Sequence, residues 1–514
     1  MLSRHVVTQT PLKLRTTSIP TTGRFFKVED VNQDLVVELR DATIEEGLLD
    51  DPSHFVLDIC STISPRTTQN LPSAEDPLKI TSLIFKNEIL YRDGRWEPTK
   101  IPKILRSADS SQHRPSTSSL KRGRSSRTTK RSARTETVHR HIAGTSQKES
   151  VEGTFIPVAG SEEQRVADWL NTITRALETF IPPVPATSGV VLTRSTAAIP
   201  IRSWSSETSR KPVKDTLMPW KPDVILRDKL IGPQPEFSWN QVISFIELTS
   251  SSYGYSDNAG AIRNAIIRKA YAIFASQPNR RFVFALSIAD QKFRAHMFDR
   301  SGVVHSRGYD IHRHPRVLLC MLSMLAFGNI DQVGYDPTFI CQYRSVSNLR
   351  KIQVASLRYD IVRRLFFNFL IHGRGTSGWH VRRKKKDYVI KDCWTHASRV
   401  NRERDILEKI KDLKGVPRLI TAWTVKIGDS VDRTDVHHPA PLHTLSSDVR
   451  IHLRMLMQPV GTPLSEFGSI RELLSVLIDI LDSTSKHIAW FVYLTVFNSS
   501  QGTLQKVPHP PSRC

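Results

Sequence analysis

The chain has few cysteines and no long apolar segment. Its 514 residues include five cysteines, which lie far apart, form no CxxC pair and have no histidines at zinc spacing. We therefore expect neither a disulfide framework nor a structural zinc site. No apolar run approaches the roughly 18 to 20 residues that cross a bilayer. These absences predict an intracellular protein, nuclear or cytoplasmic, with no membrane partner.

Acidic residues are also scarce relative to basic ones. The chain has 73 Lys and Arg against 50 Asp and Glu, a formal net charge of +23. Such a balance favours acidic partners, for example nucleic acid or phosphorylated ligands. Nearly half of the excess lies in residues 100–148, which contain 13 Lys and Arg, two acidic residues and almost no aliphatic side chains. This composition predicts a basic, disordered linker.

The linker permits two interpretations. Basic clusters such as Lys121-Arg122 and Lys130-Arg131 could lie along nucleic-acid phosphates or serve nuclear import. Alternatively, the segment is only a solvated, self-repelling connection. The residues themselves do not decide between these alternatives.

The middle of the chain alternates helical and strand patterns. Apolar spacing predicts a helix after Glu162, strands in KPDVIL and VISFIEL, a helix over 259–274, and a hairpin formed by RFVFALSI and KFRAHMFD. This order is typical of an α+β or α/β domain, and we predict an α+β chain as a whole.

Two carboxylates in this region resemble a PD-(D/E)xK nuclease core. Asp223 stands at the start of one predicted strand and Glu247 lies within the next, where both could hold Mg²⁺. The lysine expected two residues after the glutamate is replaced by Thr249. The alternatives are a weak relict metal site or ordinary surface carboxylates of an inactive core.

The stretch IHGRGTSGWHVRRKKKDYVIKDCW combines a glycine motif with a lysine. Gly373, Gly375 and Gly378 form G-x-G-x-x-G, and glycine lets the backbone approach phosphate oxygens closely. A strand-like Tyr-Val-Ile then ends in Lys391, as in the V-A-I-K element of kinases. An ordinary glycine-rich hairpin with a basic tip is the other interpretation.

Several phrases together resemble the fungal-type protein kinase family, in which a nuclease-like region precedes a divergent kinase domain. They are FDRSGVVHS, GYDPTFI, HGRGTSGW, DYVIKDCW, RERDILEKIKDLKGVPRLI and MLMQPVGTPLSEF. The resemblance implies ATP-dependent serine/threonine phosphorylation. It also implies that the three glycines cover phosphates and that Lys391 pairs with Glu403 of the next helix, with Glu408 as the alternative partner. A simple surface ion pair between Lys391 and Glu403 would need no such role.

By the same resemblance, residues 457–460 would form the linker beside adenine. Backbone groups of Gln458 and Val460 would bind the base, and Met457 would line the back of the pocket. The following segment predicts a long amphipathic helix over 470–481.

The expected catalytic motifs do not follow that helix. The 514 residues contain neither the His-Arg-Asp loop nor the Asp-Phe-Gly motif that supply a base and Mg²⁺ ligands in kinases. We therefore expect a kinase homologue truncated before its catalytic loop and catalytically deficient as this polypeptide. It would bind ATP weakly if at all and hold no Mg²⁺ at a kinase-type site. The alternative is a non-enzymatic nucleic-acid-binding or scaffold protein acting through the linker.

These observations predict five segments. In order they are a small α/β region over 1–99, the basic linker over 100–150, a degenerate nuclease-like α/β domain over 160–345, a truncated protein-kinase-like domain over 350–490, and a disordered tail over 491–514. The resemblance implies that the kinase-like domain has an amino-terminal lobe, with a five-stranded antiparallel sheet and a C helix, and an incomplete carboxy-terminal lobe.

Overall fold

The structure is a computed structural model. It describes residues 43–45, 56–58, 60, 82–85, 87–105, 160–180, 202–213, 219–228, 237–249, 258–341, 349–368, 370–413, 415–438, 448–486 and 505–506. Most of the predicted linker at 100–150 and of the predicted tail at 491–514 lies outside these residues. Among the helices that are described, none combines the length and apolarity needed to cross a membrane.

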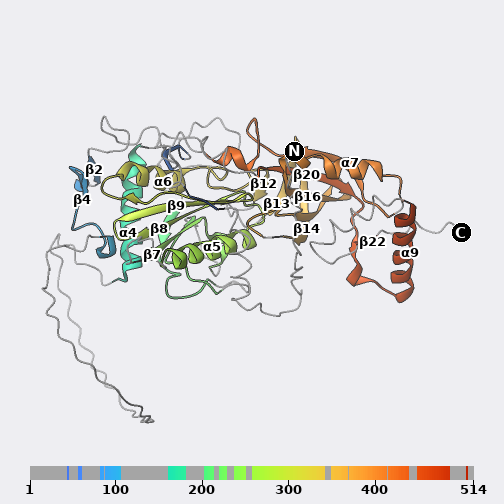
Figure 1. The fold of residues 1–514 in the computed structure, drawn as a ribbon, viewed down its shortest axis with the longest axis horizontal. Helices are drawn as coiled ribbons and strands as arrows, with labels where there is room; N and C mark the ends of the chain where they lie inside the picture. Colours follow the sequence, from blue (N-terminus) through green and yellow to red (C-terminus); the bar gives the residue numbers. More distant parts are fainter. Residues whose placement is uncertain are drawn as a thin grey trace, which may run out of the picture. The chain divides into compact units, whose positions relative to one another are not determined.

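A mixed eight-stranded sheet, here called the central sheet, occupies the first half of the described chain (Figure 1). Its order is β1-β10-β9-β8-β7-β6-β5, with β11 beside β9. The pairs β7/β8 and β1/β10 are parallel, and the other neighbours are antiparallel. The strands are β1 (Thr43–Glu45), β5 (Arg202–Ser205), β6 (Val224–Asp228), β7 (Ser244–Thr249), β8 (Val283–Ala289), β9 (Lys292–Asp299), β10 (Gly302–His305) and β11 (Tyr309–Asp310).

Helices cover both faces of the central sheet. Helices α4 (Glu162–Leu177) and α6 (Pro315–Phe327) share one core with Val224 and Ile246, whereas α5 (Asn258–Ser276) shares the other with Ile225 and Phe245. Figure 1 shows α6 and α5 on opposite sides of the sheet. Because both faces are buried, strands such as β6 and β8 carry apolar side chains on both faces of the sheet.

The amino-terminal region joins the same core. Strands β2 (Ser82–Phe85), β3 (Glu88–Arg92) and β4 (Arg95–Trp96) form a small antiparallel sheet. Trp96 packs edge-on against Trp169 of α4, with ring centroids 5.2 Å apart. Ile101 and Leu105 are also buried, 3% and 0% exposed, so residues 101–105 belong to the folded part although the sequence places them in the linker.

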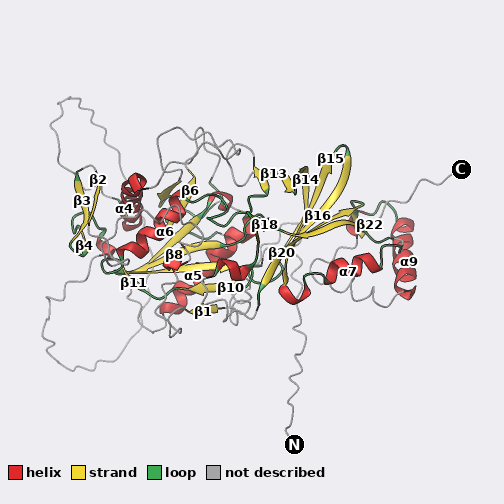
Figure 2. Cartoon of the chain, turned by 90° about the horizontal axis from the view of Figure 1, so that it is seen from above, coloured by secondary structure: helices red, strands yellow, loops and turns green. Residues whose placement is uncertain are grey.

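A second, antiparallel sheet of seven strands follows, with the order β12-β13-β14-β15-β16-β20-β17 (Figure 2). The kinase resemblance implies five strands, whereas this sheet has seven among the described residues. The strands are β12 (Phe339–Cys341), β13 (Leu349–Val354), β14 (Leu357–Phe367), β15 (Ser377–Arg383), β16 (Lys386–His396), β17 (Arg418–Thr424) and β20 (Arg450–Gln458).

Two helices accompany the second sheet. Helix α7 (Arg402–Lys409) connects β16 to β17 and packs Leu407 into a core with Val389 and Met455. Helix α9 (Ile470–Lys486) begins at the predicted residue and leaves an apolar stripe open, with Ile470 71% and Leu481 68% exposed. Two short pairs complete the description: β18 (Lys426–Ile427) with β19 (Ser430–Val431), and β21 (Thr462–Pro463) with β22 (Gln505–Lys506).

Candidate functional site

Lys391 and Glu403 form an ion pair between β16 and α7. The ammonium of Lys391 contacts Glu403 Oε1, and the side chains are only 4% and 15% exposed. Burial raises the pKa of Glu403, but Lys391 and Arg374 outweigh this effect and hold it below its ordinary value. Glu408, the alternative partner, is instead paired with Lys411 at 3.9 Å and is largely exposed.

Arg374 is a third member of this group. Its guanidinium donates to Glu403 Oε2 at 2.7 Å, so two cations share one carboxylate. Its carbonyl also accepts from the amide of Trp394 at 2.7 Å, which ties the glycine-rich loop to the end of β16. Sequence reasoning missed this residue, although it lies between the first two glycines of the motif.

The glycine-rich loop connects β14 to β15, and its glycines have distinct structural reasons. Gly373 and Gly375 have positive φ angles of 120° and 45°. A Cβ on Gly378 would lie 2.2 Å from the ring of Phe366, which packs across the strand pair at that position. Each position therefore favours glycine for a reason that exists without any ligand.

Arg300, in the turn between β9 and β10, docks into this loop. Its carbonyl accepts from the Gly373 amide at 3.0 Å, and its guanidinium donates to the carbonyl of Leu370. A Cβ on Gly375 would lie 2.5 Å from the guanidinium carbon. Arg300 also lies over the ring of Phe274, 4.6 Å from its centroid, so the central sheet and the loop are joined through one side chain.

The predicted adenine linker borders a cavity of about 770 Å³. Gln458, Val460, Arg418, His380, Asp387 and Arg363 contribute to its lining. Met457 is buried in the same core as Leu407 of α7, and Val460 packs against that core. The Gln458 side chain donates to the carbonyl of Asp387 at 2.9 Å. Lys391 is not among the lining residues, so the linker cavity and the ion pair are separate features.

A buried network of charges lies where the second sheet meets the central sheet. Arg281 donates through two nitrogens to Asp432 at 2.9 and 2.6 Å. His452 of β20 donates from Nδ1 to Asp432 at 2.8 Å and from Nε2 to Asp392 at 2.6 Å. Burial lowers the pKa of His452, but the two carboxylates outweigh it and raise the pKa to about 9. The imidazole therefore carries both protons at neutral pH.

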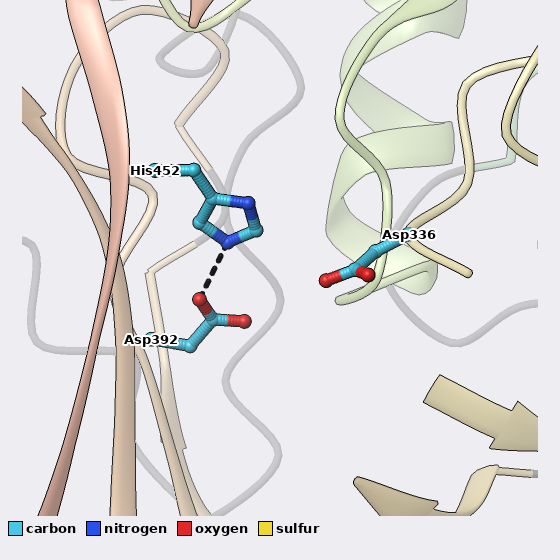
Figure 3. Close-up of side chains that lie close together, drawn as sticks. All are labelled: Asp336, Asp392 and His452. Atoms are coloured by element: carbon cyan, nitrogen blue, oxygen red, sulfur yellow. Dashed lines mark hydrogen bonds and ion pairs between the residues drawn. The ribbon is translucent and has the colours of Figure 1, made fainter. Parts of the chain in front are cut away.

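Asp336, Asp392 and His452 lie close enough to suggest a metal centre, since their ligand atoms fall within 4.8 Å of one another (Figure 3). The geometry argues against this interpretation. Arg454 donates to Asp392 at 3.1 Å and also contacts Asp336. Because a guanidinium and an imidazolium already compensate these carboxylates, the group is a salt-bridge network that needs no metal ion.

The two carboxylates of the nuclease-like interpretation lie side by side. Asp223 accepts from the amide of Leu248 at 2.8 Å, and Glu247 is buried at 8% exposure. Thr249 occupies the position of the missing lysine. Lys269 of α5, the helix that covers this face of the sheet, contacts Glu247 Oε2 instead. This lysine is 22 residues from Glu247 in the chain, which is why the motif spacing could not find it.

The comparison with family models adds the decisive observation. The model of the family described as fungal protein kinase matches residues 221–486, which is more than half of the chain. The chain belongs to the fungal protein kinase family. The match begins just before β6, ends with α9 and so includes strands of both sheets. No curated protein matches the chain.

Proposed function

We propose that the segment 349–486 of this fungal protein kinase homologue binds ATP or a similar nucleoside triphosphate without efficient phosphoryl transfer by this polypeptide. The pairing of Lys391 with Glu403 carries the proposal. In protein kinases a strand lysine that pairs with a glutamate of the next helix binds the α- and β-phosphates. Here Lys391 lies on β16, and α7, which carries Glu403, is the next α-helix.

The surroundings fit a nucleotide in part. The cavity beside Gln458 and Val460 has room for a base, and backbone groups of this linker are the predicted partners of adenine. The phosphate end fits less well. The Gly373 amide donates to Arg300, and the Arg300 guanidinium fills the space over Gly375. A bound nucleotide would compete with these contacts, which supports weak binding.

Phosphoryl transfer needs two further groups, a base for the substrate hydroxyl and carboxamide or carboxylate ligands for Mg²⁺. The motifs that carry these groups in kinases do not occur in the 514 residues. This supports nucleotide binding without catalysis as the function of the segment in this chain.

A thermal-shift titration with ATP tests the binding proposal. A ligand that binds only the folded state raises its stability by RT ln(1 + [L]/Kd), so we expect a small, saturable rise in Tm. Lys391→Met should abolish the rise, while Arg374 still compensates Glu403 and preserves the fold. Lys351→Met, at an exposed ion pair of β13, is the matched control and should leave the rise unchanged. An equal rise in wild type and Lys391→Met would refute the assignment.

A second candidate function is nucleic-acid binding through residues 100–148. The 13 Lys and Arg in this segment favour it. Nearly all of the segment lies outside the described residues, so the proposal stands on composition.

A further inference from the structure

Five consecutive basic residues lie at the end of the hairpin between β15 and β16 (Figure 2). Strand β15 ends at Arg383 and β16 begins at Lys386, so the two residues between them, both lysines, make up the whole turn. Such a run is often only a solvated surface, but the geometry of this turn is unusual. The five residues are Arg382, Arg383, Lys384, Lys385 and Lys386.

Both turn residues have a left-handed backbone conformation. The φ angles of Lys384 and Lys385 are 48° and 61°. Two-residue hairpin turns with positive φ at both positions favour Asn, Asp and Gly, because other side chains are strained there. The hairpin of β3 and β4 follows this rule, since its turn is Asp93-Gly94 with φ angles of 52° and 81°. Two lysines in the equivalent positions are a local cost that the hairpin itself does not require.

The charges beside the turn are also unfavourable for folding. Arg383 and Lys386 are register partners, and like charges directly opposite each other destabilise a strand pair. Arg383 lies 5.8 Å from the ring centroid of Tyr359, and Arg382 donates to Asp387 at 2.7 Å. The three lysines of the run are exposed, and no ion pair joins any of them to another described residue. Local rules of turn chemistry and charge are most often broken at functional sites.

The neighbouring hairpin of β13 and β14 adds charge at the same end of the sheet. Its register places Asp360 opposite Arg382. Residues 351–360 and 382–387, here together called the basic tip, contain seven Lys and Arg against two Asp, a net charge of +5. Both aspartates already form ion pairs, with Lys351 and Arg382. The basic tip therefore presents an excess of positive charge that its own carboxylates do not compensate.

The composition of the basic tip favours a phosphate backbone over a protein surface. Protein interfaces are enriched in aromatic residues and depleted in lysine. Tyr359, the aromatic residue of the tip, is only 4% exposed. Single-stranded nucleic acid also binds through bases stacked on accessible aromatic rings. A duplex needs no such ring, and it offers about one negative charge per 1.7 Å along its axis.

We propose that the basic tip binds the phosphate backbone of a nucleic-acid duplex, with Lys384, Lys385 and Lys386 as the groups that contact phosphate. Lysine binds phosphate as a point charge and needs no fixed geometry, which suits an exposed turn. Contacts to the backbone alone carry no information about base sequence, so we expect binding without sequence preference. Lys391, further along β16, is only 4% exposed, and the proposal does not depend on the nucleotide site.

The double variant Lys384→Asn/Lys385→Gly tests the tip, because Asn-Gly is a preferred pair for this turn. Its Tm should exceed that of the parent, so that weaker binding cannot result from unfolding. Lys409→Gln/Lys411→Gln removes the same charge at exposed positions in and after α7 and is the matched control. The parent is the full chain with glutamine at all basic positions of 121–134, so these linker residues do not contribute.

Fluorescence anisotropy with a labelled DNA duplex at several salt concentrations measures the binding. Each phosphate contact contributes about −0.9 to the slope of log K against log salt, so the double variant should flatten the slope by about 1.8. The control should keep the slope of the parent. Equal slopes and affinities in the parent and the double variant, or the same loss in the control, would overturn the proposal.

Three further outcomes would contradict the proposal. A Tm of the double variant below that of the parent would show that the lysines are not strained in the turn. Tighter binding by the parent to a single strand than to a duplex of the same length would refute the duplex as ligand. Binding to vesicles of phosphatidylcholine and phosphatidylserine that the double variant loses, with DNA binding unchanged, would assign the basic tip to a lipid surface instead.

Discussion

The guanidinium of Arg300 lies where a side chain on Gly375 would have to be. The distance from an ideal Cβ to the guanidinium carbon is 2.5 Å, and Arg300 is only 1% exposed. One residue of the central sheet and one of the glycine-rich loop are therefore complementary in shape. Docking onto Arg300 gives the glycine-rich loop a structural role that needs no bound phosphate.

Gly375→Ala should destabilise the chain by more than backbone strain alone accounts for. A left-handed φ of 45° costs an alanine about 1–2 kcal/mol, and the contact with Arg300 adds to it. Gly428→Ala is the control, because its φ of 59° is similar and a Cβ there meets nothing within 4 Å. Urea denaturation should show a loss larger by about 1 kcal/mol or more for Gly375→Ala.

A double-mutant cycle isolates the contact. In an Arg300→Ala background, Gly375→Ala should lower the free energy of unfolding only by the amount that backbone strain accounts for. That amount should equal the loss caused by Gly428→Ala. Equal costs at Gly375 and Gly428 in the wild-type background would show that Arg300 does not hold the loop in solution.

Phosphoryl transfer by the 514-residue chain should not depend on Lys391. This expectation follows from the proposed function, because a lysine that binds phosphates does not complete the reaction without a base and Mg²⁺ ligands. Incubation with radiolabelled Mg·ATP and a generic protein substrate should give the same background for wild type and Lys391→Met. Robust incorporation that Lys391→Met abolishes would contradict this and reveal a base outside the kinase motifs.

Local patterns predicted much of the fold. The helix after Glu162, the strands around Glu247 and the helix from Ile470 follow from apolar periodicity, which depends on neighbours in the chain. The pairing of Lys391 with Glu403 was expected from the family resemblance alone, and the structure places the two side chains in contact.

Contacts between distant segments could not be predicted. Arg300 meets Gly375 from 75 positions away, and Lys269 reaches Glu247 from 22 positions away; neither pair leaves a spacing signal. Arg454 and Asp336 are 118 residues apart. Such pairs depend on how segments distant in the chain pack together, which composition and periodicity do not encode.

Protonated His452 should make stability depend on pH in the alkaline range. Its folded pKa of about 9 exceeds the ordinary value of 6.5, so its contribution is complete below pH 6.5 and is lost as the pH rises through about 9. The shift corresponds to roughly 3 kcal/mol at most. Urea denaturation of wild type and His452→Gln should show a stability gap at pH 7 that shrinks by about 2 kcal/mol at pH 10.

His380→Gln is the control for this experiment, since His380 pairs with Asp387 outside the buried network. Its gap from wild type should not shrink in the same way. A His452→Gln gap that stays constant from pH 7 to pH 10 would mean that His452 is neutral in the folded protein and that Asp392 and Asp432 are compensated by the arginines alone.

The basic segment 100–148 should bind nucleic acid without sequence preference, because its lysines and arginines come with almost no aromatic side chains that could stack on bases. Each phosphate neutralised on duplex DNA contributes about −0.9 to the slope of log K against log salt, so engagement of five to eight phosphates predicts a slope of roughly −5 to −7.

Glutamine at all seven basic positions in the central part of this segment should flatten the slope and, if the segment also directs import, move a fluorescent fusion out of the nucleus. These positions are Lys121, Arg122, Arg124, Arg127, Lys130, Arg131 and Arg134. If neither the slope nor the localisation responds, the segment is only a connection, and the nucleic-acid-binding alternative loses its main support.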